Sequence, residues 1–248
     1  MILTLLNYNI WFGGRGREAL LAEVIRSADP DIVLFQEAID PGVIEKISRS
    51  TNMPFWSARK NHSNGFCSRI EFSHHEWHHP KGSRHGFLEV VPAGTKVHLF
   101  GVHLRAMFSK WGERRRVFEI EALLHHIKNH ERGFHILAGD FNSLAPGELL
   151  QTTKLPRWIR ALVWVSGRDI QRDTVKLIQE HGYADAFRKL HPDDKGYTFP
   201  TRDPHVRLDY VFLPQEFSDR LIDCRIVDQP PAASASDHFP LLSRFDIP

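Results

Sequence analysis

Five short apolar segments of this chain each end abruptly in a single polar side chain. These polar residues are Asn9, Glu37, His103, Asp140 and Asp209. Apolar runs of this length are typical of strands buried in a sheet. Polar residues at the ends of buried strands converge on one rim of the sheet, where α/β proteins build their sites. The sequence therefore predicts buried sheets and one functional site that collects residues from the whole chain.

Helical patterns alternate with these strands. Residues 17–28 place four apolar side chains on one helical face, Pro41 stands at the first position of a second helix, and residues 112–131 carry the longest apolar stripe. The other predicted elements are strands at 3–11, 31–37, 65–70, 86–91, 96–103, 135–140, 207–214, 220–228 and 240–245, and a helix at 170–181. Residues 144–168 are the least regular segment. Because no linker-like stretch interrupts this alternation, we expect a single domain over residues 1–248.

The charge of the chain is nearly balanced: 32 Lys and Arg against 30 Asp and Glu give a net charge of +2. This balance does not by itself indicate a nucleic-acid-binding protein. The two cysteines, Cys67 and Cys224, cannot form a disulfide framework, which favours free thiols in a reducing compartment. No segment approaches the roughly 18 uninterrupted apolar residues of a membrane helix, and the N-terminus lacks a signal-peptide pattern. We therefore expect a cytoplasmic monomer without a membrane span.

Carboxylates among the polar residues are suited to a hard divalent cation. Mg²⁺ takes oxygen ligands and keeps several waters, so one or two carboxylates, an amide oxygen and a substrate phosphate complete its site. Glu37 and Asp237 provide such carboxylates.

Other residues of the set are suited to the hydrolysis of a phosphate ester. Imidazole and carboxylate groups can generate or orient an attacking water at neutral pH, which suits His103, Asp140 and His238. A further carboxylate on the second nitrogen of a histidine fixes its tautomer and stabilises its charged form. Asp209 fits that role.

The motifs QE, HL, GDFN, RLDY and SDH occur along the chain in this order. With them the sequence resembles the endonuclease/exonuclease/phosphatase superfamily, the metal-dependent phosphoesterases with a deoxyribonuclease I-like fold. The resemblance extends from Asn9 to His238. It implies an α/β fold of four layers, a sandwich of two packed, mostly antiparallel sheets with helices on both outer faces.

The resemblance also implies a metal site. In the family, the asparagine at Asn9 and the glutamate at Glu37 hold the metal and its water network, and the terminal aspartate at Asp237 supplies a further carboxylate. We expect one Mg²⁺ or Mn²⁺ there. Trp11 stands where the apurinic-endonuclease branch has an acidic residue, which leaves a second metal and abasic-site nuclease activity open.

Five residues take catalytic roles by the same resemblance. Asp140 and Asn142 orient the nucleophilic water and the scissile phosphate, and His238 is a catalytic imidazole. His103 matches a second histidine that binds phosphate or serves as an acid. Asp209 pairs with one of the two histidines, and relatives differ over which.

Arg116 is a further candidate, on the predicted helix that follows His103. It matches an arginine of many relatives, and with Asn142 and His103 it would bind substrate. The alternative is a solvated position on the helix face.

These assignments predict hydrolysis of a phosphodiester by a water molecule with the help of Mg²⁺ or Mn²⁺. A nucleic acid, a phospholipid head group and a small organic phosphodiester all remain open as substrates. A phosphomonoesterase of the same superfamily is the alternative.

A different hydrolase motif also occurs in the chain. His75, Glu76, His79 and His85 match the zinc-protease pattern H-E-x-x-H-x-x-G-x-x-H. That motif requires a helix, and Pro80 would clash with a helical carbonyl four residues earlier. We expect an exposed polar loop between two strands here, with a zinc metalloprotease and a weak metal-binding loop as the alternatives.

Overall fold

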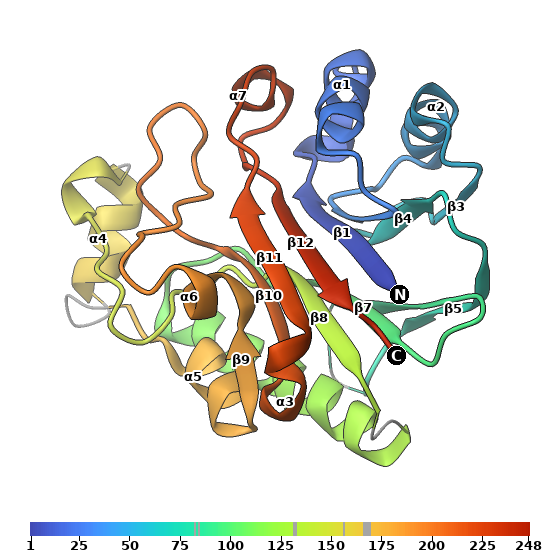
Figure 1. Ribbon diagram of the computed structural model, residues 1–248. Coiled ribbons are helices and arrows are strands. Elements are labelled where there is room, and N and C mark those ends of the chain that lie inside the picture. Colours follow the sequence, from blue (N-terminus) through green and yellow to red (C-terminus); the bar gives the residue numbers. More distant parts are fainter. Residues whose placement is uncertain (82, 84, 131–132, 156, 166–169) are drawn as a thin grey trace.

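The computed structural model describes residues 1–248 except 82, 84, 131–132, 156 and 166–169. Two six-stranded sheets pack face to face, and helices cover the outer face of each (Figure 1). The four-layer α/β sandwich predicted from the sequence is confirmed. Both sheets are mixed, because each contains one parallel pair among antiparallel neighbours.

The first sheet has the strand order β11-β12-β1-β2-β4-β3. Its strands are β1 (Ile2–Asn9), β2 (Ile32–Gln36), β3 (Phe55–Ala58), β4 (Gly65–Ser68), β11 (Leu221–Ile226) and β12 (Leu241–Asp246). β1 and β2 form its parallel pair. Every residue of β2 is buried, since the second sheet covers one of its faces and helices cover the other.

The second sheet has the strand order β5-β6-β7-β8-β10-β9. Its strands are β5 (Phe72–His78), β6 (Phe87–Pro92), β7 (His98–His103), β8 (His135–Asp140), β9 (Tyr183–Asp185) and β10 (Asp209–Pro214). β7 and β8 form its parallel pair. β10 runs antiparallel to β8, so it begins at the edge where β8 ends.

Helices of each outer layer bury one apolar face against their sheet. The layer on the first sheet contains α1 (Glu18–Ala28), α2 (Pro41–Thr51) and α7 (Ala232–Ala235). The layer on the second sheet contains α3 (Lys110–His130) and α5 (Asp173–Glu180). The shorter elements are η1 (Phe12–Gly14), η2 (Thr152–Lys154), α4 (Arg157–Val165), α6 (Ala186–Leu190) and η3 (Gln215–Arg220). As predicted, Pro41 begins α2, and Asp40 caps it by accepting a hydrogen bond from the backbone N–H of Gly42 at 3.0 Å.

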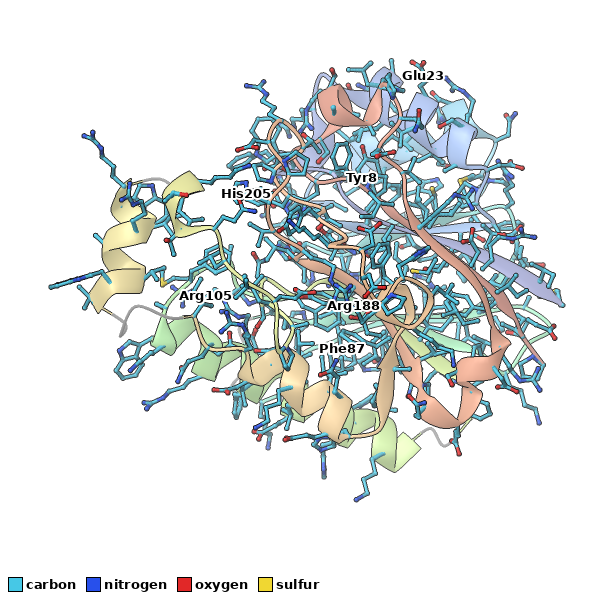
Figure 2. All side chains as sticks on the ribbon, turned by 60° about the vertical axis from the view of Figure 1, so that its left-hand side comes forward. Tyr8, Glu23, Phe87, Arg105, Arg188 and His205 are labelled. Atoms are coloured by element: carbon cyan, nitrogen blue, oxygen red, sulfur yellow. The ribbon has the colours of Figure 1, made fainter. Side chains whose placement is uncertain are left out.

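Apolar clusters hold the four layers together. The middle cluster lies between the sheets and contains Leu34 and Ile136. Tyr8 belongs to the cluster under α1 and α2, whereas Phe87 belongs to the cluster under α3 and α5, and the two side chains lie toward opposite sides of the molecule (Figure 2). Full burial of a leucine-sized side chain contributes roughly 1.5–3 kcal/mol, so these clusters supply most of the favourable free energy of folding.

The ends of the central strands meet at one rim of the sandwich. Asp140, the last residue of β8, is in register with His103 of β7 on one side and with Asp209 of β10 on the other. Asn9, the last residue of β1, reaches Asp140 across the two sheets through a hydrogen bond. The convergence of polar strand ends predicted from the sequence is therefore confirmed.

Two segments differ from the sequence-based expectations. The exposed loop expected over residues 74–85 begins later, because β5 continues through His78 as the edge strand of the second sheet. Residues 79–81, 83 and 85 form the loop, and residues 82 and 84 lie outside the described residues. The segment 144–168, expected to be the least regular, contains helix α4. Cys67 and Cys224 are free, buried thiols, as predicted.

Among the residues that the structure describes, no helix combines the length and the apolar character needed to cross a membrane.

Gly139 gives a first prediction, because it brings β8 very close to β7. A Cβ atom at residue 139 would lie 1.9 Å from the carbonyl oxygen of Val102. That oxygen belongs to the backbone and cannot move without separating the parallel pair. We expect Gly139→Ala to lower the free energy of unfolding by at least about 2 kcal/mol, which urea denaturation measures.

Gly133→Ala is the matched control, since a Cβ atom there would have no neighbour within 4 Å. Its stability should stay within about 0.5 kcal/mol of the wild type. Equal stabilities of the two variants would contradict the close approach of the strands.

Candidate active site

Asp140 lies at the centre of the candidate site and is only 1% exposed. Its Oδ2 atom accepts a hydrogen bond from Asn9 Nδ2 at 3.1 Å. The same oxygen lies 3.7 Å from His103 Nε2 and 3.9 Å from His238 Nε2. Burial raises the pKa of Asp140 above its ordinary value, although the charge of His238 opposes this effect. The carboxylate can therefore exchange a proton closer to neutral pH than an exposed aspartate can.

His238 forms a buried pair with Asp209. Its Nδ1 atom lies 2.8 Å from Asp209 Oδ2, and the ring of Phe199 packs against the imidazole at 4.7 Å between centroids. Burial alone would lower the pKa of His238, but the charge and hydrogen bond of Asp209 raise it above its ordinary value. The sequence left the partner of Asp209 open between two histidines, and in the structure Asp209 pairs with His238.

His103 has the opposite electrostatic environment. Its Nδ1 atom makes a short hydrogen bond with Ser63 Oγ. Burial lowers the pKa of His103 to about 3, and the positive charges of nearby His85 and His238 act in the same direction. Two histidines on either side of Asp140 therefore differ in charge at pH 7, one neutral and one positive.

A group of oxygen atoms lies next to Asp140 at the end of β2. Glu37 adopts a left-handed backbone conformation with φ 58°, which turns the chain sharply after the strand. Its Oε2 atom accepts a hydrogen bond from the backbone N–H of Phe12 at 2.6 Å, and its Oε1 atom lies 3.4 Å from Asn9 Nδ2. Asn9 Nδ2 therefore bridges the carboxylates of Glu37 and Asp140.

Asp237 adds an unsatisfied oxygen to this group. Its Oδ1 atom is buried and has no hydrogen-bond partner among the described residues. Burial raises the pKa of Asp237, and the negative charge of Glu37 raises it further, while His238 lowers it. Two carboxylates that repel each other, one with an unsatisfied oxygen, form a donor set that fits a hard divalent cation.

Asn142 is held by the backbone around Asp140. Its φ is 49°, a left-handed conformation that asparagine tolerates better than most residues. Its backbone N–H donates to Asp140 Oδ1 at 2.9 Å, and its Nδ2 donates to the carbonyl oxygen of Leu104 at 3.0 Å. The residue thus links the loop after β8 to the end of β7.

Of the two roles predicted for Arg116, the solvated position on the helix face is wrong. The side chain is fully buried, which excludes a solvated position on the helix face. Its guanidinium donates to Glu113 Oε2 at 2.6 Å and to the carbonyl oxygens of Arg105 and Met107, so its donors are engaged within the protein. Glu113 in turn accepts from Ser143 Oγ at 3.0 Å. Arg116 and Glu113 therefore connect the loop after β7 to the loop after β8.

Two serines of the site could not be found from the sequence. Ser63 contacts His103, and Ser236 Oγ donates to the carbonyl oxygen of Asn9 at 2.7 Å. The Ser236 contact joins the turn before His238 to the end of β1. Single serines in loops carry no pattern that distinguishes them from ordinary surface residues.

The zinc-protease alternative is wrong, because its first half lies in a strand. His75 and Glu76 belong to β5, so their side chains point to opposite faces of the sheet. The ring of His75 packs against Phe72 at 4.9 Å, whereas that of His79 packs against His62 at 5.3 Å. The helical turn that would bring the two histidines onto one zinc ion does not form.

One known family matches almost the entire chain. The model of the Endonuclease/Exonuclease/phosphatase family matches residues 6–238. The chain belongs to this family. It is therefore an enzyme of a hydrolase superfamily that acts on phosphoesters. No curated protein matches the chain.

Solved structures of several proteins share this fold. An AP endonuclease from Archaeoglobus fulgidus is 21% identical with a TM-score of 0.73, and the match covers 99% of this chain and 100% of that chain. The 3′ phosphatase NExo from Neisseria, bound to a product DNA hairpin, is 18% identical with a TM-score of 0.71 and coverages of 98% and 99%. TDP2 from D. rerio, complexed with a single-strand DNA product, is 18% identical with a TM-score of 0.68 and coverages of 99% and 99%.

The pair of His238 and Asp209 gives the prediction of this section. Asp209→Asn keeps the shape of the side chain but removes the charge that raises the pKa of His238. Burial still lowers the pKa of His238, and Asp140 and Asp237 still raise it, so we expect this pKa to fall when the charge of Asp209 is removed. NMR titration of the imidazole resonances measures this change. The pKa of His135, whose surroundings do not include Asp209, should stay constant. An unaltered titration of His238 would show that Asp209 does not charge this ring.

Proposed function

We propose that this chain hydrolyses a phosphodiester with the help of one Mg²⁺ or Mn²⁺ ion. The observation that supports the proposal best is the bridge through Asn9, whose Nδ2 atom contacts both Glu37 and Asp140. It brings oxygen ligands suited to a cation next to a carboxylate suited to activating water. The family's phosphoester chemistry requires these two components side by side.

The cation would be held by Glu37, Asp237 and the amide oxygen of Asn9. When bound, it supplies positive charge that offsets the charge developing on the phosphate oxygens. Asn9 Oδ1 accepts a hydrogen bond from the backbone N–H of Trp11 at 3.0 Å, which fixes the orientation of the amide. The indole of Trp11 offers no oxygen ligand, so we propose a single ion.

Asp140 is the group we assign to the attacking water. Its raised pKa lets the carboxylate accept a proton near neutral pH, and Asn9 and the backbone of Asn142 hold both of its oxygens. A fixed carboxylate orients the water toward phosphorus before the reaction, which reduces the entropic part of the barrier.

The two histidines and Asn142 are the groups we assign to the phosphate. His238, kept positive by Asp209, can donate from Nε2 to a phosphate oxygen as negative charge develops there. His103 is neutral, and its hydrogen bond with Ser63 fixes the ring so that Nε2 faces Asp140. Asn142, on the loop after β8, is held by Asp140 and by the carbonyl oxygen of Leu104, and we assign it a positioning role.

The substrate class is a separate part of the proposal. Two of the structural neighbours are described with DNA products, which supports a nucleic acid as the first substrate to test. Phe12, whose backbone N–H binds Glu37, is 73% exposed and could stack on a base beside the cation. A panel of single-stranded DNA, double-stranded DNA, a choline phospholipid and a p-nitrophenyl phosphomonoester separates the alternatives.

The dependence on a metal gives a prediction. We expect hydrolysis of bis-(p-nitrophenyl) phosphate with Mg²⁺ or Mn²⁺. We expect complete loss of activity in EDTA, because EDTA removes the cation from its proposed carboxylate and amide oxygen ligands. Release of p-nitrophenol measures the rate, and added Mg²⁺ should restore it. Turnover that persists after exhaustive chelation would rule out the role of the metal.

Glu37→Gln and Asp209→Asn should impair different properties of the enzyme, the first its affinity for Mg²⁺ and the second its turnover. For Glu37→Gln we expect the midpoint of the Mg²⁺ titration to rise more than about tenfold, because a charged ligand is lost. For Asp209→Asn we expect kcat to fall on the order of 10²–10⁴-fold with an unchanged midpoint, as when a histidine loses its orienting carboxylate in serine hydrolases. Recovery of full turnover by Asp209→Asn at high Mg²⁺ would instead make Asp209 a metal ligand.

A further inference from the structure

A cluster of metal-ligating side chains lies under α3, outside the candidate active site. His78 of β5, Glu89 of β6 and His126 of α3 each offer one ligand atom, and these atoms lie within 4.8 Å of one another. Glu89 is in register with Phe100, three residues before His103. At about 3.3 Å per residue the cluster is roughly 10 Å along the strand from the catalytic rim.

The carboxylate of Glu89 is buried and held at both oxygens. Its side chain is 8% exposed, and that of His78 is 14% exposed. Glu89 Oε2 lies 2.5 Å from His78 Nε2, and Glu89 Oε1 lies 2.6 Å from His98 Nδ1. The carboxylate of Glu89 is therefore held at both oxygens in a largely dry environment.

Aromatic packing fixes the two imidazoles of the cluster. The ring of His126 lies 4.3 Å from that of His78, and Phe87 stacks on His78 at 4.9 Å and contacts His126 at 5.4 Å. Figure 2 places Phe87 in the interior beside the helix layer of the second sheet. Side chains confined in this way lose little further freedom when they bind a ligand.

We propose that His78, Glu89 and His126 bind a Zn²⁺ ion or a similar divalent transition metal. Two imidazoles and one carboxylate are a common zinc ligand set, and imidazole ligands favour Zn²⁺ over Mg²⁺. Ligands at about 2.0–2.1 Å in a tetrahedral site are about 3.3 Å apart, so His78 Nε2 and Glu89 Oε2 need to separate by less than about 1 Å. His98, on the other oxygen of Glu89, is placed to orient that ligand.

The position of the cluster gives the ion a structural effect. Within the described part of the chain, β5 is the edge strand of its sheet and pairs through its backbone with β6 alone. An ion shared by β5, β6 and α3 would tie this edge to the longest helix of the molecule. Because the unfolded chain does not bring the three ligands together, binding of the ion would stabilise the folded state.

The experiment uses the whole chain, stripped of metal with EDTA, dialysed, and supplied with excess Mg²⁺ to occupy the oxygen site. Co²⁺, which reports its coordination through visible absorption, is titrated first, and Zn²⁺ is then added to displace it. We expect one equivalent of Co²⁺ to give the intense absorption of a four-coordinate ion. Zn²⁺ at about 100 times its Kd should raise Tm by about 5–10 °C. Wild-type protein with neither the absorption nor the shift in Tm would overturn the proposal.

Two neighbouring histidines on α3 provide a matched pair of variants. His126→Gln should lose the Co²⁺ absorption and the shift in Tm, whereas His125→Gln, changed at an exposed position, should keep both. Phosphodiesterase turnover of His126→Gln should stay within a few fold of the wild type, since the cluster lies outside the catalytic rim. If this variant does not fold, His78→Gln tests the same loss from β5.

Glu37→Gln separates the two metal sites. The Co²⁺ absorption should persist in this variant, because Glu37 belongs to the oxygen site and not to the cluster. Absorption that disappears with Glu37→Gln and persists with His126→Gln would place the ion at the catalytic rim and overturn the proposal.

Discussion

The burial of the Asp140 carboxylate is the constraint around which the catalytic rim is arranged. A charged carboxylate removed from water costs several kcal/mol unless hydrogen bonds and opposite charges compensate for the lost hydration. Asn9 and the backbone of Asn142 supply the hydrogen bonds, and the imidazole of His238 supplies a positive charge. Asp209, paired with Nδ1 of His238, contributes most to keeping that charge on the buried ring, and Asp140 and Asp237 add to its effect. The site is thus a network of side chains in which the charge of each group affects the pKa of its neighbour.

The topology explains how residues so distant in sequence form this chain of contacts. Each sheet places a parallel pair at its centre, and the two pairs end at a common rim. Glu113 connects the loops that follow β7 and β8. It accepts hydrogen bonds from Ser143 of the second loop and from Arg116, which binds backbone carbonyl oxygens of the first loop. The beginning of α3 therefore controls the spacing between the loop that follows His103 and the loop that carries Asn142.

The sequence predicts those parts of the fold and site that depend on local pattern. Strand ends such as Asn9 and Asp140 are recognisable because an apolar run stops at a polar residue, and the beginning of α2 is recognisable from Pro41. The burial of Arg116 is not predictable from the sequence. An arginine three residues after a glutamate on a helix can form a buried ion pair or can be exposed to solvent, and the sequence pattern is the same in both cases. β5 was missed for a related reason: its polar residues resemble a loop, and only pairing with β6 makes them a strand. Tertiary contacts of this kind decide structure without a local signature.

The polar character of β5 has a consequence for the behaviour of the protein in concentrated solution. An edge strand exposes unpaired N–H and C=O groups, which can recruit a strand from a neighbouring molecule and begin aggregation. The register of β5 against β6 shifts between Phe72 and His74, and the side chains of His74 and Glu76 are each more than half exposed. The shift makes the edge irregular, and the hydrated ionisable side chains would have to lose water before a strand of another molecule could pair there. The residues that obscure this strand in the sequence therefore also protect it against intermolecular sheet formation.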